Sequence, residues 1–196
     1  MVNEVMSKSI NSKFLCNVEE SCFIVIDIQE KLTQAMPGKV VERLKCNTSI
    51  LLTAAKQLGI PVMASAQYPK GLGQVEESIK NELTDSSIYI EKTCFSCLQA
   101  DGFKEQLAGL NVSQVILVGI EAHICVLQTA FDLFNEGYNV FVVADAIASR
   151  KLTSYESAIM RMNQAGIKII NTESVLFEWL EDASHPEFKS LSRLIV

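Results

Sequence analysis

The sequence predicts one domain with a three-layer α/β/α, Rossmann-like fold around a six-stranded, mostly parallel sheet. Short apolar runs rich in β-branched residues alternate along the chain with amphipathic stretches of helical length. This alternation is typical of parallel strands joined by helical crossovers. The chain has 196 residues, of which 48% are hydrophobic, enough for one core on both faces of a sheet.

The strands are expected where the apolar runs are densest. In chain order they are residues 22–28, 61–66, 88–90, 114–120, 139–144 and 167–170, of which 88–90 gives the weakest signal. Helices are expected between them at residues 41–58, 102–107, 122–136 and 154–165. Gly59, Gly137 and Gly166 directly follow three of these helices, and glycine readily takes the left-handed conformation that ends a helix.

The whole chain, residues 1–196, is expected to form a single domain with an N-terminal arm (1–20) and a C-terminal tail (181–196). No stretch approaches the roughly 18 to 20 apolar residues that a membrane span needs. The first 13 residues lack the apolar segment of a secretory signal, so a cytoplasmic protein is expected. Residues past Trp179 could dock on the domain itself or on a neighbouring subunit.

Charge and cysteine content narrow the class of function. The formal net charge is −6 and no cluster of lysine and arginine offsets it, which argues against binding the phosphate backbone of a nucleic acid. Six cysteines in a chain without a signal indicate a reducing compartment, where they stay thiols. A small-molecule substrate is the expected partner.

The candidate site follows from topology. Right-handed crossovers place the loops after all parallel strands at one edge of the sheet, and ligands of such folds bind outside that edge. Side chains that follow a strand should therefore be neighbours in space. The reactive or polar residues at these positions are Asp27, Gln67, Tyr68, Lys92, Thr93, Glu121, His123, Cys125 and Asp145.

Cys125 is the candidate nucleophile among them. It lies within one turn of the start of the expected 122–136 helix, where backbone N–H groups and the helix dipole favour a thiolate. The same N–H groups could hold a developing oxyanion. A small buried cysteine that only fills space is an equally good interpretation from position alone.

Asp27 and Lys92 are the candidate base and cation. Asp27 interrupts an apolar run as its strand leaves the core, where a carboxylate needs a partner. Lys92 follows the third expected strand, residues 88–90. If its ammonium lies between Asp27 and Cys125, it would keep the carboxylate charged and lower the thiol pKa. Taken singly, a strand-end aspartate more often caps a turn and a lysine is more often solvated. Their coincidence at one edge favours a site.

At this point the sequence resembles the isochorismatase-like cysteine hydrolase superfamily, from Phe23 to about Ser192. The matching motifs are FIVIDIQEKL around Asp27, EKTCFS around Lys92 and VGIEAHICVLQTAFDLFNEGYNVFVVADAIASR around Cys125. The segments QYPKGLG and GIEAHICVLQTA are most similar to the isochorismatase domain-containing branch.

The resemblance implies that Asp27, Lys92 and Cys125 form a catalytic triad. It also implies a non-proline cis peptide between Ile120 and Glu121, which would turn the backbone N–H groups of Glu121 and Cys125 toward one oxyanion. Members of the superfamily commonly assemble as dimers or larger oligomers, so a homo-oligomer is expected.

The sequence departs from the metal-binding members of that superfamily. Nicotinamidases carry an Asp-x-His segment after the second strand, where this chain has Gln67, Tyr68 and Pro69. The only histidines are His123 and His185, an inventory that does not favour a catalytic zinc site. No metal or other cofactor is expected, and the retained cysteine favours acyl transfer over vinyl ether hydrolysis.

Several further residues have two interpretations. Gln67, Tyr68, Phe95 and His123 are candidates for binding substrate, although Phe95 could equally pack in the core and His123 could cap a helix. Cys94 and Cys97 could form a dithiol redox pair, but a thioredoxin-like pair should open a helix directly after a buried strand, and here Lys92 follows the strand. Asp145 and Ser149 are expected to fix the turn after the fifth strand.

The function predicted from the sequence is hydrolysis of a small amide, carbamoyl or related acyl substrate. Asp27 would take the thiol proton of Cys125, which attacks the carbonyl, and the Glu121 and Cys125 backbone N–H groups would hold the oxyanion. A binding or scaffold protein of the same fold, whose cysteine is vestigial, is the alternative.

Overall fold

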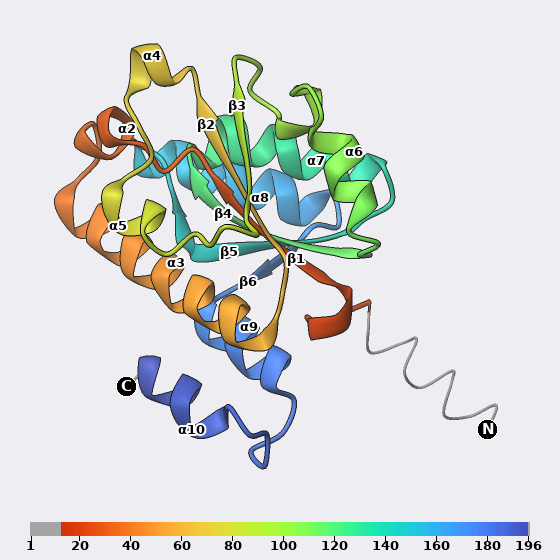
Figure 1. Cartoon of the computed structure of the whole chain (residues 1–196). Coiled ribbons are helices and arrows are strands. Elements are labelled where there is room, and N and C mark those ends of the chain that lie inside the picture. Colours follow the sequence, from red (N-terminus) through yellow and green to blue (C-terminus); the bar gives the residue numbers. More distant parts are fainter. Residues whose placement is uncertain (1–12, 196) are drawn as a thin grey trace.

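The computed structural model describes residues 13–195, which fold around one six-stranded sheet in the order β3-β2-β1-β4-β5-β6. All neighbouring strands are parallel. The strands are β1 Ser21–Ile26, β2 Val62–Gln67, β3 Ile88–Lys92, β4 Gln114–Ile120, β5 Asn139–Ala148 and β6 Lys168–Ile170 (Figure 1). The predicted α/β fold with six strands is confirmed. The expected arm falls partly outside the described residues.

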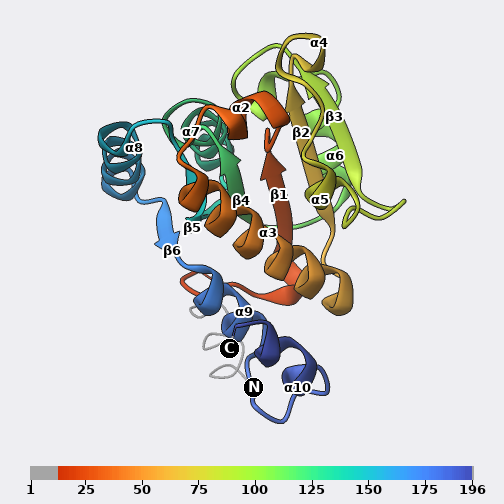
Figure 2. The same ribbon diagram turned by 90° about the vertical axis from the view of Figure 1, so that its left-hand side faces the viewer.

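Helices cover both faces of the sheet. In Figures 1 and 2, α3 (Gly38–Leu58) and α9 (Thr172–Leu180) lie on one face, and α6 (Phe103–Gly109), α7 (Leu127–Asn135) and α8 (Leu152–Gln164) lie on the other. The shorter helices are α2 Glu30–Gln34, α4 Pro69–Leu72, α5 Glu77–Lys80 and α10 Phe188–Leu191, with 3-10 turns at Val18–Glu20, Cys97–Gln99 and Ser192–Leu194. No helix of residues 13–195 is both long and apolar enough to cross a membrane.

Strand β1 lies at the centre of the sheet, and every one of its residues is buried. Successive side chains of a strand point to opposite faces, so Phe23 and Val25 belong to the core under α3 and α9, whereas Ile24 and Ile26 belong to the core under α6, α7 and α8. This double burial explains why the strand reads as a continuous apolar run rather than an alternating one.

Two elements differ from the sequence-based expectation. Strand β5 continues to Ala148 instead of ending at residue 144, with a shift of register against β4 between Leu117 and Gly119. The expected 122–136 helix is divided into a π-helical turn, Ala122–Val126, and α7. Cys125 therefore lies in the π-helical turn that precedes the α-helix.

Helix α9 was not predicted, yet it completes the core. Trp179 is 1% exposed, and its ring meets that of Phe23 edge to face with centroids 6.2 Å apart. Beyond it, Leu191 of α10 is fully buried in the same core cluster. The C-terminal tail thus packs on its own domain through Leu191.

The ends of β1 and β4 approach each other closely at Gly119. This residue has a φ of +131°, and a Cβ built on it would lie 2.0 Å from the carbonyl oxygen of Ile26. Only glycine fits this position without moving backbone. The contact brings the residues after β1 next to the segment that follows β4, where the candidate site lies.

Candidate active site

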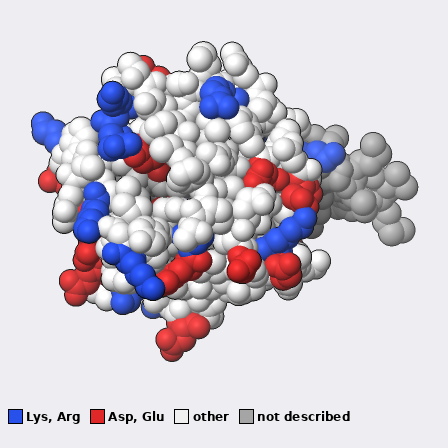
Figure 3. Space-filling model, turned by 90° about the horizontal axis from the view of Figure 1, so that it is seen from above, with Lys and Arg blue, Asp and Glu red and all other residues white. Residues whose placement is uncertain are grey.

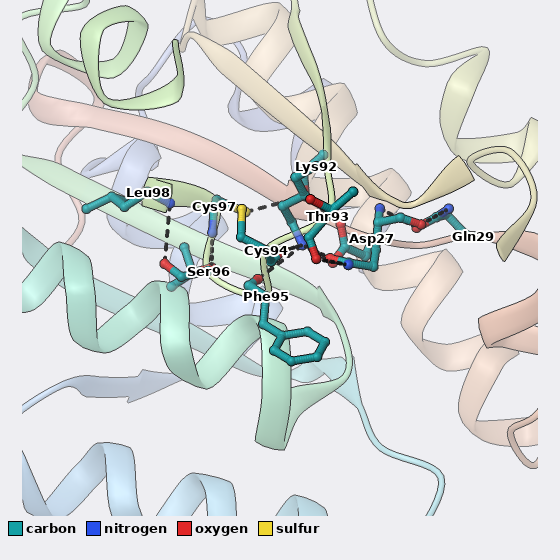
Figure 4. A network of polar contacts seen from close by, with 12 residues as sticks. Asp27, Gln29, Lys92, Thr93, Cys94, Phe95, Ser96, Cys97 and Leu98 are labelled. Carbon is teal, nitrogen blue, oxygen red and sulfur yellow. Dashed lines mark hydrogen bonds and ion pairs between the residues drawn. The ribbon is translucent and has the colours of Figure 1, made fainter. Parts of the chain in front are cut away.

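Asp27, Lys92 and Cys125 come together at the carboxyl edge of the sheet. Asp27 directly follows β1 with a left-handed φ of +52°, Lys92 is the last residue of β3, and Cys125 lies in the turn after β4. Lys92 Nζ is 2.6 Å from Asp27 Oδ2, and both side chains are fully buried (Figure 4). The chain folds this way because parallel strands end at one edge of their sheet.

The Asp27 carboxylate receives donors from two neighbouring strands. Lys92 of β3 donates to Oδ2, and Ser65 Oγ of β2 donates to Oδ1 at 2.7 Å. The carboxylate also acts on Cys125, whose thiol pKa it raises. A buried carboxylate is tolerated only when it is paired and hydrogen-bonded in this way.

The Lys92 ammonium is held by acceptors on every side. Besides Asp27, it donates to Gln67 Oε1 at 2.7 Å and to the backbone carbonyls of Phe95 at 3.1 Å and Cys94 at 3.3 Å. Burial alone would lower the pKa of Lys92, but Asp27 and the sulfurs of Cys97 and Cys125 outweigh it and raise the pKa above its usual value. The amine therefore stays charged at neutral pH.

The Cys125 side chain is buried, with 6% of the residue exposed. Burial is the largest cause that raises the pKa of its thiol, Asp27 raises it further, and Lys92 lowers it by less. The expectation of a lowered thiol pKa is therefore wrong, because the sequence does not reveal how deeply the sulfur is buried. Cys125 rests as a thiol beside a carboxylate that can accept its proton.

The peptide bond between Ile120 and Glu121 is cis, as the resemblance implied. The Glu121 carboxylate is turned to the start of α8, where Arg150 Nε lies 2.6 Å from Oε1 and the Arg150 N–H donates to Oε2 at 3.3 Å. This ion pair was not predicted. No spacing rule links Glu121 to Arg150, since they meet only through the register of β4 and β5.

The four residues expected to contact substrate lie in different surroundings. Gln67 is 8% exposed, with its amide oxygen facing Lys92 and its amide nitrogen donating to Thr93 O at 2.7 Å. Tyr68 and Phe95 are about half exposed, at 53% and 52%, so Phe95 does not pack in the core. In Figure 4 the Phe95 ring points away from the polar network.

His123 lines a cavity next to the start of α8. The imidazole Nδ1 of His123 is 2.9 Å from Ser149 Oγ and 3.5 Å from Glu121 Oε2. Ser149 was expected to fix the turn after the fifth strand, but its hydroxyl orients this imidazole. The cavity has a volume of about 290 Å³ and is lined by Glu121, His123, Arg150, Lys151 and Ser154. Asp145, by contrast, is structural, since its Oδ1 accepts from the backbone N–H and the hydroxyl of Thr172.

Cys94 and Cys97 are separate thiols in different environments. Cys94 is partly exposed, whereas Cys97 is fully buried and its sulfur contacts Ser65 Oγ at 3.4 Å. Sequence reasoning missed Ser65, although a hydroxyl inside the apolar segment VMASA was a usable signal. Within residues 13–195, no three or more His, Cys, Asp or Glu side chains are grouped as metal ligands.

Comparison with known proteins decides the family. A model of the isochorismatase domain matches residues 21–174. The chain belongs to the isochorismatase-like hydrolase family. Isochorismatase domain-containing protein 1 of Danio rerio is 38% identical over 176 residues, which cover 89% of this chain and 60% of that protein. The chain thus spans about 60% of the length of this isochorismatase relative.

Other isochorismatase relatives have different names. The secreted isochorismatase effector Isc1 of Phytophthora sojae is 37% identical over 183 residues, covering 89% of this chain and 84% of that protein. A structure described as MAR1 ribonuclease from Caenorhabditis elegans superposes with a TM-score of 0.86 at 37% identity, covering 92% of each chain.

The isochorismatase fold is shared more widely. The YcaC gene product of Escherichia coli, described as an octameric hydrolase of unknown specificity, superposes with a TM-score of 0.85. The two chains are 22% identical, and the match covers 92% of this chain and 89% of YcaC. At this identity the likeness concerns the fold.

Proposed function

We propose that this protein hydrolyses a small amide, carbamoyl or related acyl substrate with Cys125 as nucleophile, Asp27 as base and Lys92 as the charge-setting cation. One observation carries the proposal: a buried Asp27–Lys92 ion pair, 2.6 Å apart, whose two charges both act on the Cys125 thiol. A nucleophile within reach of an oriented base is the usual arrangement for covalent catalysis.

The proposed reaction has two halves. Asp27 takes the thiol proton as the Cys125 sulfur forms a bond to the substrate carbonyl carbon, and the backbone N–H groups of Glu121 and Cys125 hold the oxyanion. The carbon–nitrogen bond then breaks, and the amine leaves with the proton from Asp27. Water, deprotonated by Asp27, attacks the thioester, releases the acid and restores the thiol. No cofactor is required.

Gln67, Tyr68, Phe95 and His123 are proposed to surround the substrate. His123 lines a cavity together with Glu121 and residues 150, 151 and 154. Tyr68 and Phe95, which follow β2 and β3, carry exposed rings. Gln67 contributes through Lys92, since its amide oxygen accepts from that ammonium.

A small molecule suits this edge better than a nucleic acid. Figure 3 looks down on it and shows positive and negative side chains interspersed around a largely uncharged centre. With a net charge of −6, the chain lacks the continuous positive surface that phosphate backbones require. We also propose a homo-oligomer, which the octameric assembly described for YcaC supports.

The test is a substrate panel of small amides, carbamoyl compounds, esters and a short RNA. Turnover by the wild type that is lost in Cys125→Ala and Asp27→Asn, with circular dichroism unchanged, is the expected result. Cys46→Ala is the matched control, because Cys46 is an exposed cysteine. Turnover that survives in Cys125→Ala contradicts the mechanism. Tight binding without turnover identifies a binding protein, and cleavage of RNA alone contradicts the proposed substrate class.

A further inference from the structure

Next to the Asp27 carboxylate lie two further polar side chains, Ser65 and Cys97, that the proposed mechanism does not use. Ser65 of β2 is 1% exposed, and Cys97, at the start of the 3-10 turn Cys97–Gln99, is fully buried. Both side chains lie in a part of the core where every polar atom needs a partner inside the protein.

The directions of the hydrogen bonds between these side chains are fixed by chemistry. An ionised carboxylate only accepts, so Ser65 Oγ must donate its single proton to Asp27 Oδ1, at 2.7 Å. Ser65 Oγ is then left as an acceptor for the Cys97 thiol, whose sulfur lies 3.4 Å away. A chain of donors thus runs from Cys97 through Ser65 and ends on Asp27.

Cys97 is itself held in place and held in the donor form. Its backbone N–H donates to Thr129 Oγ1 of α7 at 2.9 Å. Burial, the largest cause, together with the charge of Asp27, raises the pKa of the Cys97 thiol to about 11. The sulfur therefore keeps its proton at neutral pH and can donate it to Ser65.

We propose that Ser65 is a positioning residue for the catalytic base: its hydroxyl, oriented by Cys97, binds Oδ1 of Asp27, favours the ionised carboxylate and leaves the remaining acceptor sites to Lys92 and Cys125. The inference rests on the proposed function, in which Asp27 is the base. It gives a role to Cys97 that is neither redox chemistry nor simple space filling.

The geometry explains why Asp27 needs such support. Asp27 leaves β1 in a left-handed conformation, and its backbone N–H is bonded to Ser65 O at 3.1 Å. The same serine thus holds both the backbone and the side chain of Asp27. A carboxylate that is fixed before reaction loses little free energy in reaching the productive geometry.

The test compares Ser65→Ala with a matched control, Ser21→Ala. Ser21 is also a buried strand serine, whose hydroxyl hydrogen-bonds Asn17 O, Gln114 Oε1 and Trp179 Nε1, but it lies at the opposite end of β1 from Asp27. Both variants remove one buried hydroxyl, so both should lose some stability. Only Ser65→Ala removes a donor from the base.

The readout is the chemical shift of the Asp27 carboxyl carbon at neutral pH, followed without substrate by carbon NMR of protein labelled at the aspartate carboxyl carbon and assigned with Asp27→Asn. This resonance responds to the hydrogen bonds that the carboxylate accepts, and Ser65→Ala removes the one at Oδ1. Ser65→Ala should therefore move the resonance away from its wild-type position.

The Asp27 resonance in Ser21→Ala should match that of the wild type, and Cys97→Ala should move it in the same direction as Ser65→Ala but by less. An unchanged resonance in Ser65→Ala, or an equal displacement in Ser21→Ala, overturns the proposal. Because no substrate is involved, this outcome is separate from failure of the proposed hydrolysis, which the substrate panel measures.

Discussion

At the scale of single residues, the site consists of charges that depend on one another. Burying one ion is expensive, and its partner offsets that only when geometry and further hydrogen bonds are good. Asp27 and Lys92 meet this condition, since Ser65, Gln67 and two backbone carbonyls complete their coordination. Such a network fixes one arrangement of the side chains, and removing any member leaves the others unpaired.

Replacing Lys92 by methionine should be strongly destabilising. The change leaves the Asp27 carboxylate buried without its counter-ion, which typically costs about 3–5 kcal/mol. Urea denaturation at neutral pH measures the loss. Lys45→Met is the control: Lys45 pairs with Glu76 at 2.9 Å, but the pair is partly exposed, so about 0–1 kcal/mol is expected. Equal losses in both variants would contradict the importance of burial.

Asp27→Asn should separate thiol reactivity from catalysis. The carboxylate raises the pKa of Cys125 by its charge and its hydrogen bond, whereas Lys92 lowers it. Removing the charge of Asp27 leaves Lys92 as the dominant neighbour, so the thiol should ionise at lower pH. The titration is followed by thiolate absorbance in the far ultraviolet. The contribution of Cys125 is the difference between the Asp27→Asn variant and the double variant that carries both Asp27→Asn and Cys125→Ala. A thiol that ionises at higher pH than in the wild type contradicts the described electrostatics.

The sequence was sufficient to predict which residues meet at this edge of the sheet. It was not sufficient to predict how deeply they are buried or which side chains pair with them. Asp27, Lys92 and Cys125 were found because each follows a parallel strand, a rule that depends only on topology. The raised thiol pKa and the Glu121–Arg150 ion pair could not be predicted in this way. Both depend on burial depth and on side-chain directions that arise from packing.

At the scale of elements, the segment from β4 into α7 carries most of the site. It contains Gly119, the cis peptide after Ile120 and the π-helical turn with Cys125. Apolar periodicity at 3.6 residues predicts one continuous helix here, since it cannot register a single wider turn. π-helical turns are rare and occur frequently at functional sites.

Gly119→Ala should be among the most damaging single substitutions in the protein. The new Cβ would lie 2.0 Å from Ile26 O and would occupy a residue with a φ of +131°, so β1 and β4 would have to separate. A loss of more than about 4 kcal/mol, or failure to fold, is expected. Chemical denaturation and the soluble yield measure it.

Gly109→Ala is the control for this glycine. Gly109 ends α6, and a Cβ there meets nothing within 4 Å. Alanine at such a helical position is neutral or stabilising by up to about 1 kcal/mol. If Gly119→Ala behaved like Gly109→Ala, the close contact between β1 and β4 would not be as the structure describes it.

At the scale of the whole molecule, four of the six cysteines are buried thiols: Cys16, Cys22, Cys97 and Cys125. Burial is the first cause that raises the pKa of each of them, to about 12 for Cys22 and about 11 for Cys97. The folded protein therefore holds thiol protons that the unfolded chain releases near pH 9, and this difference links stability to pH.

The free energy of unfolding should fall as pH rises above about 9, the ordinary pKa of these thiols. The unfolded chain then binds fewer protons than the folded one, so each buried thiol removes up to about 1.4 kcal/mol per pH unit until its own folded pKa is reached. The raised pKa of Lys92 acts in the same direction above its ordinary value of 10.5. Denaturant titrations from neutral pH to about pH 10.5, under reducing conditions, measure the slope.

Two cysteine variants check the origin of this slope. Cys22→Ala removes a buried thiol and should make the decline shallower, whereas Cys46→Ala removes an exposed one and should leave it unchanged. A stability that stays flat over the whole alkaline range would mean that the buried thiols do not resist ionisation.

The overall architecture was predictable because a parallel sheet buried on both faces leaves a strong pattern in the sequence. The six apolar runs and the glycines that follow helices were sufficient for it. Helix α9 was not predicted, although its buried residues Val175, Leu176, Trp179 and Leu180 recur at helical spacing, because it spans only nine residues. Its role becomes visible only in three dimensions, where Trp179 packs against Phe23.

That contact has a consequence for biosynthesis. Phe23 leaves the ribosome long before its partner Trp179, and Leu191 follows later still. Contacts so distant in sequence form late and slow the search for the native state. During translation the central strand β1 therefore exposes one apolar face, and we expect the nascent chain to depend on chaperones until α9 and α10 are released.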